Sequence, residues 1–218
     1  MNDQSFISYF FARGDSVSKE RPKYRQIIEA AVEVIADNGF HSSQVSKIAK
    51  KANVADGTIY LYFKNKEDIL ISVFREKMGS FIEKTTEAIQ YNQTASDKLL
   101  TFIRLHYEQL AENPCLAIVT QLELRQSKPE LRNEINQVFK SYLDLIDTII
   151  EKGIEDGEVR HDINPQIIRQ MIFGTLDETV TTWVMKAQRY PLVDQAEDVH
   201  HLLTRGLFPQ VQKHHIHS

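Results

Sequence analysis

Apolar residues recur at intervals of three and four along nearly the whole chain, and polar residues fill the positions between them. This spacing places the apolar side chains on one face of a helix. The first such segment begins at Pro22, which suits a first helical turn, and ends at Gly39, which suits the residue after a helix. No segment shows the two-residue alternation of a β-strand. The pattern therefore predicts an all-α fold.

About nine helices are predicted, three short ones followed by six longer ones. The short helices span about 22–38, 44–52 and 56–63, and the long ones begin near residues 66, 96, 114, 129, 165 and 195. Capping residues and first-turn prolines mark four of these starts. They are Asn65 with Asp68, Asn113 with Pro114, Pro129, and Asn164 with Pro165.

This arrangement predicts a small domain at 21–66 and a larger one at 67–208. Residues 1–20, which hold an aromatic patch, do not continue the helical pattern. Residues 209–218, which include the sequence HHIH, do not continue it either. Both ends are expected to be flexible tails.

Composition narrows the class of protein, and the charge distribution separates the two domains. No stretch approaches eighteen consecutive apolar residues, so no membrane-spanning helix is expected. The single cysteine, Cys115, excludes an internal disulfide and favours a reducing, cytoplasmic location. Residues 19–66 hold nine Lys/Arg against five Asp/Glu, whereas residues 67–218 hold sixteen against twenty-three. A basic module on an acidic body indicates an anionic partner for the module.

Residues 43–66 carry the most informative pattern of candidate binding residues in the chain. A helix, a turn of three or four residues and a second short helix predict a helix-turn-helix. The second helix, at 56–63, presents a face of the size that enters the major groove of DNA. Gly57 has no side chain, so the start of this helix can approach a phosphate. The Tyr and Lys residues at 60, 62, 64 and 66 carry groups that bind phosphate.

The run from Ile48 to Leu70, IAKKANVADGTIYLYFKNKEDIL, resembles the DNA-binding signature of TetR-type bacterial regulators. Three further runs, at 21–40, 117–127 and 169–185, resemble the FadR-type regulators of fatty-acid degradation in Bacillus and related bacteria. The resemblance implies a cytoplasmic, homodimeric repressor of fatty-acid degradation genes. It implies that the repressor binds a palindromic operator and is released by long-chain acyl-CoA, without a metal or other cofactor.

The DNA-binding residues are expected on the short helices and at the start of the next one. The resemblance places backbone or base contacts at Thr58 and Tyr60 and a phosphate contact at Lys66. Relatives often have Ser where this chain has Ala55, so the usual side-chain cap is missing. Asp56 either serves the helix end or accepts a hydrogen bond from a cytosine amino group. The complete expected set is Lys23, Ser43, Gln44, Val45, Asp56, Gly57, Thr58, Tyr60, Leu61, Tyr62, Lys64 and Lys66.

The larger domain is expected to hold the effector and to form the dimer. An acyl chain needs an apolar tunnel, and the candidate residues for its wall are Phe74, Met78, Phe81, Phe102, Leu105, Leu122, Tyr142, Phe173, Leu176 and Trp183, unless these are plain core. The phosphates of coenzyme A need basic groups, and the candidates are Arg125, Lys128 and Arg132, with Arg104, unless these pair with Glu123, Glu130 or Glu134. The dimer is expected to use Gly174, Thr175, Leu176, Thr179 and Trp183 of one helix and Leu202, Leu203 and Leu207 of the last one.

Two alternatives remain open from the sequence. A regulator of the same type could sense another hydrophobic ligand, such as a drug or a free fatty acid. An enzyme is disfavoured, because the neighbouring acids Asp177 and Glu178 point about 100° apart on a helix and cannot flank one bond. Cys115 and His106 could form a thiol–imidazole pair, but lone Cys and His residues are usually part of a core.

Overall fold

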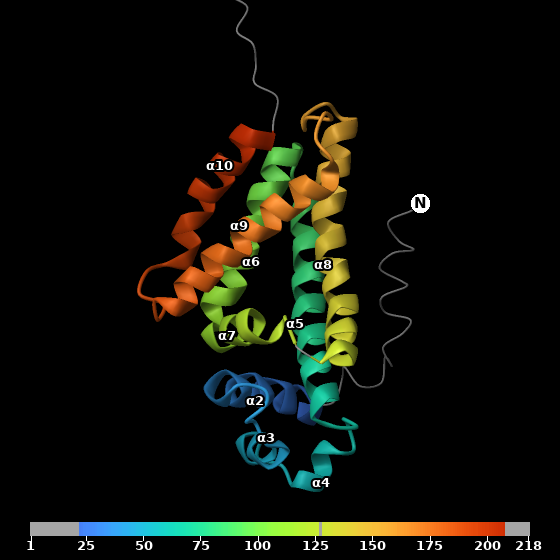
Figure 1. Cartoon of the computed structure of the whole chain (residues 1–218), viewed down its shortest axis with the longest axis vertical. Helices are drawn as coiled ribbons and strands as arrows, with labels where there is room; N and C mark the ends of the chain where they lie inside the picture. The colour runs from blue at the N-terminus through green and yellow to red at the C-terminus, as the bar shows by residue number, and fades with distance from the viewer. Residues whose placement is uncertain (1–21, 127, 208–218) are drawn as a thin grey trace, which may run out of the picture. The chain divides into compact units, whose positions relative to one another are not determined.

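The computed structural model describes residues 22–126 and 128–207 (Figure 1). The expected tails, 1–20 and 209–218, lie outside the described residues. Contacts divide the chain into a unit that ends at Val73 and a unit that begins at Phe74. This division comes later than the predicted boundary after residue 66. The first turns of the helix that starts there bury Ile69, Leu70 and Val73 in the first unit.

The described residues form nine α-helices and one 3₁₀ helix, without a strand, which confirms the predicted all-α fold. The first unit holds α2 (Pro22–Asn38), α3 (Val45–Lys51), α4 (Asp56–Ile59) and the start of α5 (Lys66–Ile89). The second unit holds the rest of α5 and the remaining helices. These are α6 (Ala95–Glu112), α7 (Pro114–Glu123), α8 (Pro129–Glu155), α9 (Pro165–Met185), η1 (Leu192–Gln195) and α10 (Ala196–Leu207).

The first unit is a helix-turn-helix built on α2. Asn53 ends α3 in the left-handed conformation, with φ of 51°, because Asn tolerates this backbone better than most residues. Its neighbour Val54 donates to the carbonyl of Ala49 at 3.0 Å and so closes the turn. The helix predicted over 56–63 is shorter, since α4 ends at Ile59 and the chain continues in turns to Phe63.

A capping box begins α5, as the sequence predicts. The side chain of Asn65 accepts from the backbone N–H of Asp68 at 2.8 Å, and the Asp68 carboxylate accepts from the N–H of Lys64 at 2.9 Å. The first bond pairs a donor that the first turn of the helix leaves unsatisfied, and the second pairs a donor just before the helix.

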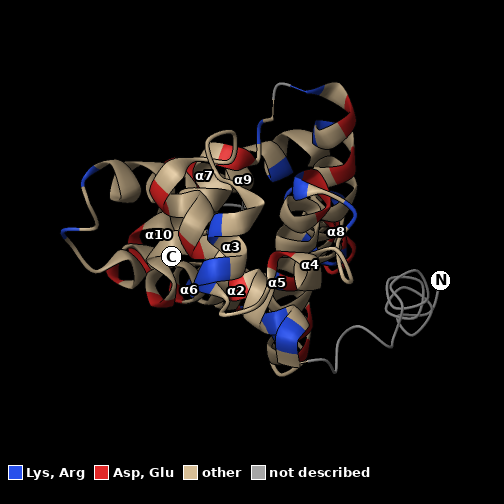
Figure 2. Ribbon diagram, turned by 90° about the horizontal axis from the view of Figure 1, so that it is seen from below, with Lys and Arg blue, Asp and Glu red and all other residues tan. Residues whose placement is uncertain are grey.

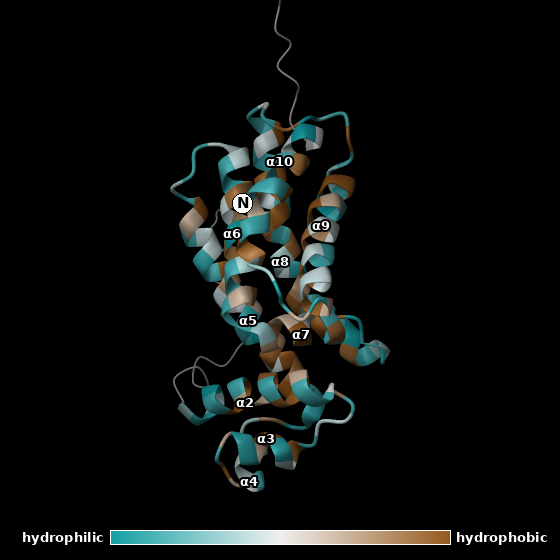
Figure 3. Ribbon diagram, turned by 90° about the vertical axis from the view of Figure 1, so that its left-hand side faces the viewer, coloured by the Kyte–Doolittle hydropathy of each residue, from teal (hydrophilic) through white to brown (hydrophobic). Residues whose placement is uncertain are grey.

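In the second unit, α6 packs against α8 and α10, and α8 packs against α9. Their apolar residues gather between the helices (Figure 3). Asn113 and Asn164 cap α7 and α9, each by accepting a backbone N–H at 2.9 Å. The first turn of α6 has a cap from far along the chain, because Glu158 accepts from the N–H of Ala95 at 2.5 Å. Among the described helices, none is long and apolar enough to cross a membrane.

Candidate nucleic-acid interface and buried aromatic cluster

Helix α4 and the turn after it present an exposed face of the first unit. Tyr60 and Leu61 are 59% and 79% exposed, although both are large and partly apolar. Asp56, Gly57 and Lys64 are also exposed, and a Cβ atom built on Gly57 would meet nothing within 4 Å. Basic residues lie on the neighbouring α3 (Figure 2). The face is therefore open to a large, flat or grooved partner.

The buried side of α4 holds this face in place. Ile59 is fully buried, and the ring of Phe63 stacks on the ring of Tyr24 with a centroid distance of 5.2 Å. Tyr62 lies beside Tyr24 at 6.3 Å, so it is half-buried and its ring serves the packing. Ala55 precedes the helix without a side-chain cap, as the sequence indicates.

Ser43 is not available to DNA through its side chain. It is 2% exposed, and its hydroxyl lies 2.7 Å from the carbonyl of Gly39 and 3.2 Å from that of Val34. A serine there satisfies carbonyl groups at the end of α2. The expected contact at this position therefore has to be corrected, whereas Lys23 and Gln44 are exposed and Val45 is half-buried.

Lys66 is engaged inside the first unit. Its ammonium donates to the carbonyls of Phe40 and His41 at 2.9 Å and 3.0 Å, and it lies 4.6 Å from the centroid of the Phe40 ring. An ammonium has three N–H donors, so one is left for another acceptor. The side chain thus ties the start of α5 to the loop after α2.

An aromatic cluster lies in the second unit and joins four helices. Tyr142 of α8 lies between 5.3 Å and 6.2 Å, centroid to centroid, from rings on α5, α6 and α9 and from Phe139 of its own helix. The members of the cluster are Phe81, Phe102, His106, Phe139, Tyr142 and Phe173. Four of the predicted tunnel residues therefore come together.

Two members of the cluster, His106 and Phe139, were not in the predicted set. His106 follows Phe102 by four residues and Phe139 precedes Tyr142 by three, so helical spacing could have found them. The Tyr142 hydroxyl lies 3.4 Å from Nδ1 of His106. Burial lowers the pKa of His106 to about 4, and burial is the main cause that raises the pKa of Tyr142 well above its ordinary value. Both groups are therefore uncharged at neutral pH.

The other predicted tunnel residues are spread over the unit. Leu122 is 58% exposed, so it lies at the surface and does not line the interior. Trp183 is buried, and its indole N–H donates to the carbonyl of Tyr190 at 2.8 Å. Phe74 and Leu176 are buried, and Met78 and Leu105 are half-buried, without a described ring contact to the cluster.

The predicted basic cluster is only partly assembled. Arg125, Lys128 and Arg132 are all exposed around the junction of α7 and α8. Arg104 pairs instead with Glu197 of α10. The partner of Arg125 is Asp177 of α9, at 2.6 Å, rather than one of the predicted glutamates.

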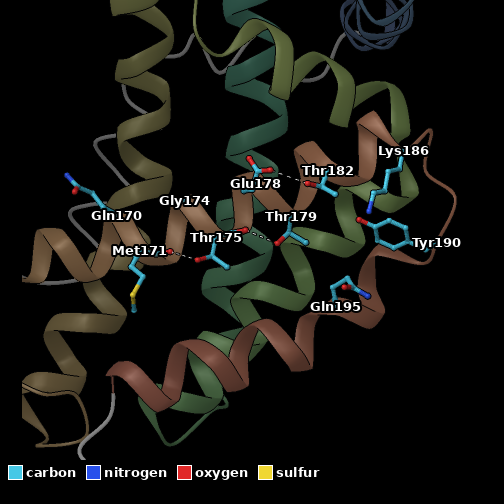
Figure 4. A pocket seen from close by; sticks show the side chains of 10 residues that line it. All are labelled: Gln170, Met171, Gly174, Thr175, Glu178, Thr179, Thr182, Lys186, Tyr190 and Gln195. Carbon is cyan, nitrogen blue, oxygen red and sulfur yellow. Dashed lines mark hydrogen bonds between the residues drawn. The ribbon is translucent and has the colours of Figure 1, made fainter.

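A wide, open pocket of about 840 Å³ runs along the exposed face of α9 (Figure 4). Its wall includes Met171, Gly174, Thr175, Glu178 and Thr179. Glu178 faces this pocket whereas its neighbour Asp177 contacts Arg125 on the turn after α7, so the two carboxylates diverge as predicted.

The expected dimer residues divide between this exposed face and the core. Leu176, Trp183 and Leu203 are buried within their own unit and are unavailable to a second copy, which corrects the prediction. Gly174 and Leu202 are exposed, Thr175 and Thr179 are half-buried, and the side chain of Leu207 lies outside the described residues. Among the described residues, no group of three His, Cys, Asp or Glu side chains could hold a metal ion.

Comparison with known proteins gives matches over both units. Residues 27–73 match the family described as bacterial regulatory proteins, tetR family, and residues 74–206 match the YsiA-like protein, C-terminal region. The fatty acid metabolism regulator protein of Bacillus subtilis (strain 168) is 59% identical over 191 residues, which cover 88% of this chain and 98% of the relative.

Two solved structures are also similar. FadR from Bacillus subtilis in complex with stearoyl-CoA superposes with a TM-score of 0.82 at 60% identity, over 84% of this chain and 98% of that one. The fatty acid degradation regulator FadR from Bacillus halodurans has a TM-score of 0.82 at 54% identity, over 84% of this chain and 99% of that one.

Proposed function

This chain belongs to the TetR family of bacterial regulatory proteins, and from that premise we propose that it represses fatty-acid degradation genes and that long-chain acyl-CoA releases it from DNA. The observation that carries the proposal is the extent of the similarity. The match to the Bacillus subtilis regulator covers both units, so it includes the unit in which an effector would bind. The relative with stearoyl-CoA gives the class of effector.

The first unit supports the DNA-binding half of the proposal. A face that leaves Tyr60 and Leu61 exposed, beside the basic residues of α3, suits the edge of a major groove and its phosphates. Gly57 leaves room for the backbone to approach a phosphate at the start of α4. Of the expected contacts, all except Ser43 remain part of the proposal.

The aromatic cluster supports the acyl-CoA half. It is the apolar region to which α5, α6, α8 and α9 all contribute, and an acyl chain gains about 0.8 kcal/mol for each methylene that it buries. The exposed side chains of Arg125, Lys128 and Arg132 lie around the α7–α8 junction, and their positive charge suits the phosphates of the coenzyme. Phe81 lies in the cluster and on α5, the helix that begins at Lys66 in the first unit. A ligand that moves Phe81 therefore acts on a helix that also belongs to the DNA-binding unit.

A homodimer fits the exposed face of α9 and α10. Met171, Met185 and Leu202 are 41%, 77% and 69% exposed, which is unusual for three large apolar residues on adjacent helices. A second copy that covered them would present two α4 faces to a palindromic operator.

One binding experiment tests the whole proposal. The full-length protein first selects an operator from a pool of random duplexes, and fluorescence anisotropy then follows its release by stearoyl-CoA, coenzyme A or stearate. We expect release by micromolar stearoyl-CoA and none by coenzyme A at the same concentration, because the tail supplies most of the binding energy. Release by stearate or an uncharged hydrophobic compound alone would favour another hydrophobic effector. Turnover of stearoyl-CoA without selection of any duplex would favour an enzyme.

A further inference from the structure

The contact between Arg125 and Asp177 joins two helices at the edge of the second unit. The guanidinium of Arg125, on the turn that ends α7, lies 2.6 Å from the carboxylate of Asp177 in the middle of α9. The two side chains differ in exposure, with 60% of the Arg125 side chain exposed against 15% of that of Asp177. The carboxylate is thus embedded, while much of the guanidinium still faces water.

This ion pair lies next to the aromatic cluster. Asp177 follows Phe173 by four residues, so the two side chains share a face of α9. Phe173 contacts both Phe139 and Tyr142. Asp177 also contributes, after burial and Tyr107, to the raised pKa of Tyr142, which is consistent with a carboxylate close to that hydroxyl. A ligand whose tail enters the cluster at this side would bring its head to the ion pair.

An anionic ligand head at this ion pair would attract the guanidinium of Arg125 and repel the carboxylate of Asp177. A guanidinium prefers a phosphate in a bidentate contact over a carboxylate that it contacts through one nitrogen. An embedded carboxylate that loses its partner is costly, because little water can replace the lost charge. Asp177 therefore competes with the ligand for Arg125.

We propose that Arg125 is the residue that binds a phosphate of the effector and that Asp177 is its built-in competitor, which raises the effector concentration needed for release from DNA. The inference rests on the proposed function, because it needs an acyl ligand with an anionic head. Transfer of Arg125 from Asp177 to the ligand breaks the ion pair between α7 and α9. When that ion pair is broken, the hydrogen bond that Thr181 of α9 donates to Gln121 of α7, at 2.8 Å, still joins the two helices.

The test compares three variants with the wild type by calorimetric titration of stearoyl-CoA. Asp177→Asn keeps the shape and removes the competing charge, so stearoyl-CoA should bind about tenfold more tightly. Arg125→Ala should bind it about tenfold more weakly. The double variant, with Asp177→Asn and Arg125→Ala, avoids an unpaired half-buried carboxylate, and so it stays informative if Arg125→Ala proves unstable.

The neutral thioester of N-acetylcysteamine with the same acyl chain is the second ligand. It carries no phosphate, so neither substitution should change its affinity by more than about twofold, within the context-dependence of such contacts. Asp147→Asn is the matched control protein, because Asp147 pairs with Arg169 at 2.5 Å and also joins α9 to a neighbouring helix. It should bind both ligands like the wild type.

Three results would overturn the proposal. One is an Asp177→Asn variant that binds stearoyl-CoA no more tightly than the wild type. Another is a gain of equal size in the Arg125→Ala background, because that would show simple repulsion of the ligand by Asp177. The third is an equal gain for the neutral thioester. If the wild type itself does not bind stearoyl-CoA, the proposed function fails, which is a distinct outcome.

Discussion

At the scale of single residues, two lysines at the start of α5 have different surroundings although the sequence makes them look alike. Lys64 has an exposed side chain, and its backbone N–H donates to the carboxylate of Asp68. The ammonium of Lys66 has two carbonyl partners and an aromatic ring. Lys64 is therefore suited to a phosphate, and Lys66 to the support of the unit as well.

We expect Lys64→Ala to weaken binding to all duplexes and to reduce the slope of log K against log salt by about one unit, because one phosphate contact is lost. The unfolding free energy of the Lys64→Ala variant should stay unchanged. Lys66→Ala should lower the unfolding free energy by about 1 kcal/mol or more, since two hydrogen bonds are lost. Urea denaturation and salt titrations of DNA affinity measure both effects. Equal stability of the two variants would contradict this assignment.

His106 makes the stability of the second unit depend on pH. Its pKa is about 4 in the folded protein and 6.5 as an ordinary value, so the unfolded chain binds the proton more readily. Folding stability is therefore fully present above pH 6.5 and is lost as the pH falls towards 4. The loss attributable to this group between pH 7 and pH 4 is about 3 kcal/mol.

The measurement is chemical denaturation of the wild type and of His106→Gln at several pH values. We expect the variant to lose less stability on acidification, because its side chain does not titrate in this range. Parallel pH profiles for the two proteins would show that the imidazole is not held neutral by burial.

At the scale of the helices, the sequence predicted the residues where helices begin better than it predicted what each helix face contacts. Asn113, Asn164 and the three first-turn prolines act locally, so spacing alone located α7, α8 and α9. Helical spacing also placed Trp183 and Leu203 on apolar stripes, but it could not say whether a stripe faces its own core or a second copy. The pairing of Arg125 with Asp177 was equally beyond reach, because the two residues are 52 positions apart.

The two kinds of apolar residue on α9 should therefore behave differently when changed. Trp183→Ala should lower the unfolding free energy by about 3–5 kcal/mol, because a buried ring is removed from the core. Met171→Glu should leave that free energy nearly unchanged and weaken self-association, because Met171 lies exposed at the open pocket. Sedimentation velocity at several concentrations, combined with denaturation at low concentration, separates the two effects. A fully dimeric Met171→Glu protein would place the interface elsewhere.

At the scale of the whole molecule, both proposed ligands are anions, but they meet surroundings of opposite charge. Residues 19–73 have a balance of +2, from nine Lys/Arg and seven Asp/Glu, and residues 74–218 have −5, from sixteen and twenty-one. DNA can therefore be attracted to the first unit at long range. A coenzyme thioester has to be held in the second unit by short-range contacts and by burial of its tail.

This difference predicts opposite responses to salt. Raising the salt concentration from 50 mM to 200 mM should weaken operator binding by orders of magnitude, through release of counterions. The affinity for stearoyl-CoA should change much less. Stearoyl-CoA at 100 times its dissociation constant should also stabilise the folded chain by about 2.7 kcal/mol, visible as a higher melting temperature. A salt dependence of stearoyl-CoA binding as steep as that of DNA would show that charge dominates in both units.

The threonines of α9 change how its exposed face meets water. Thr175 and Thr179 each donate their hydroxyl hydrogen to a carbonyl one turn earlier in the same helix, at 2.7 Å. Hydropathy scales count such residues as polar, yet the one donor of each hydroxyl is already paired inside the helix, and their methyl groups remain to be covered. Removal of water from these two side chains therefore leaves no hydroxyl donor without a hydrogen bond. These two threonines can thus be buried against a partner at a lower desolvation cost than their class as polar residues suggests.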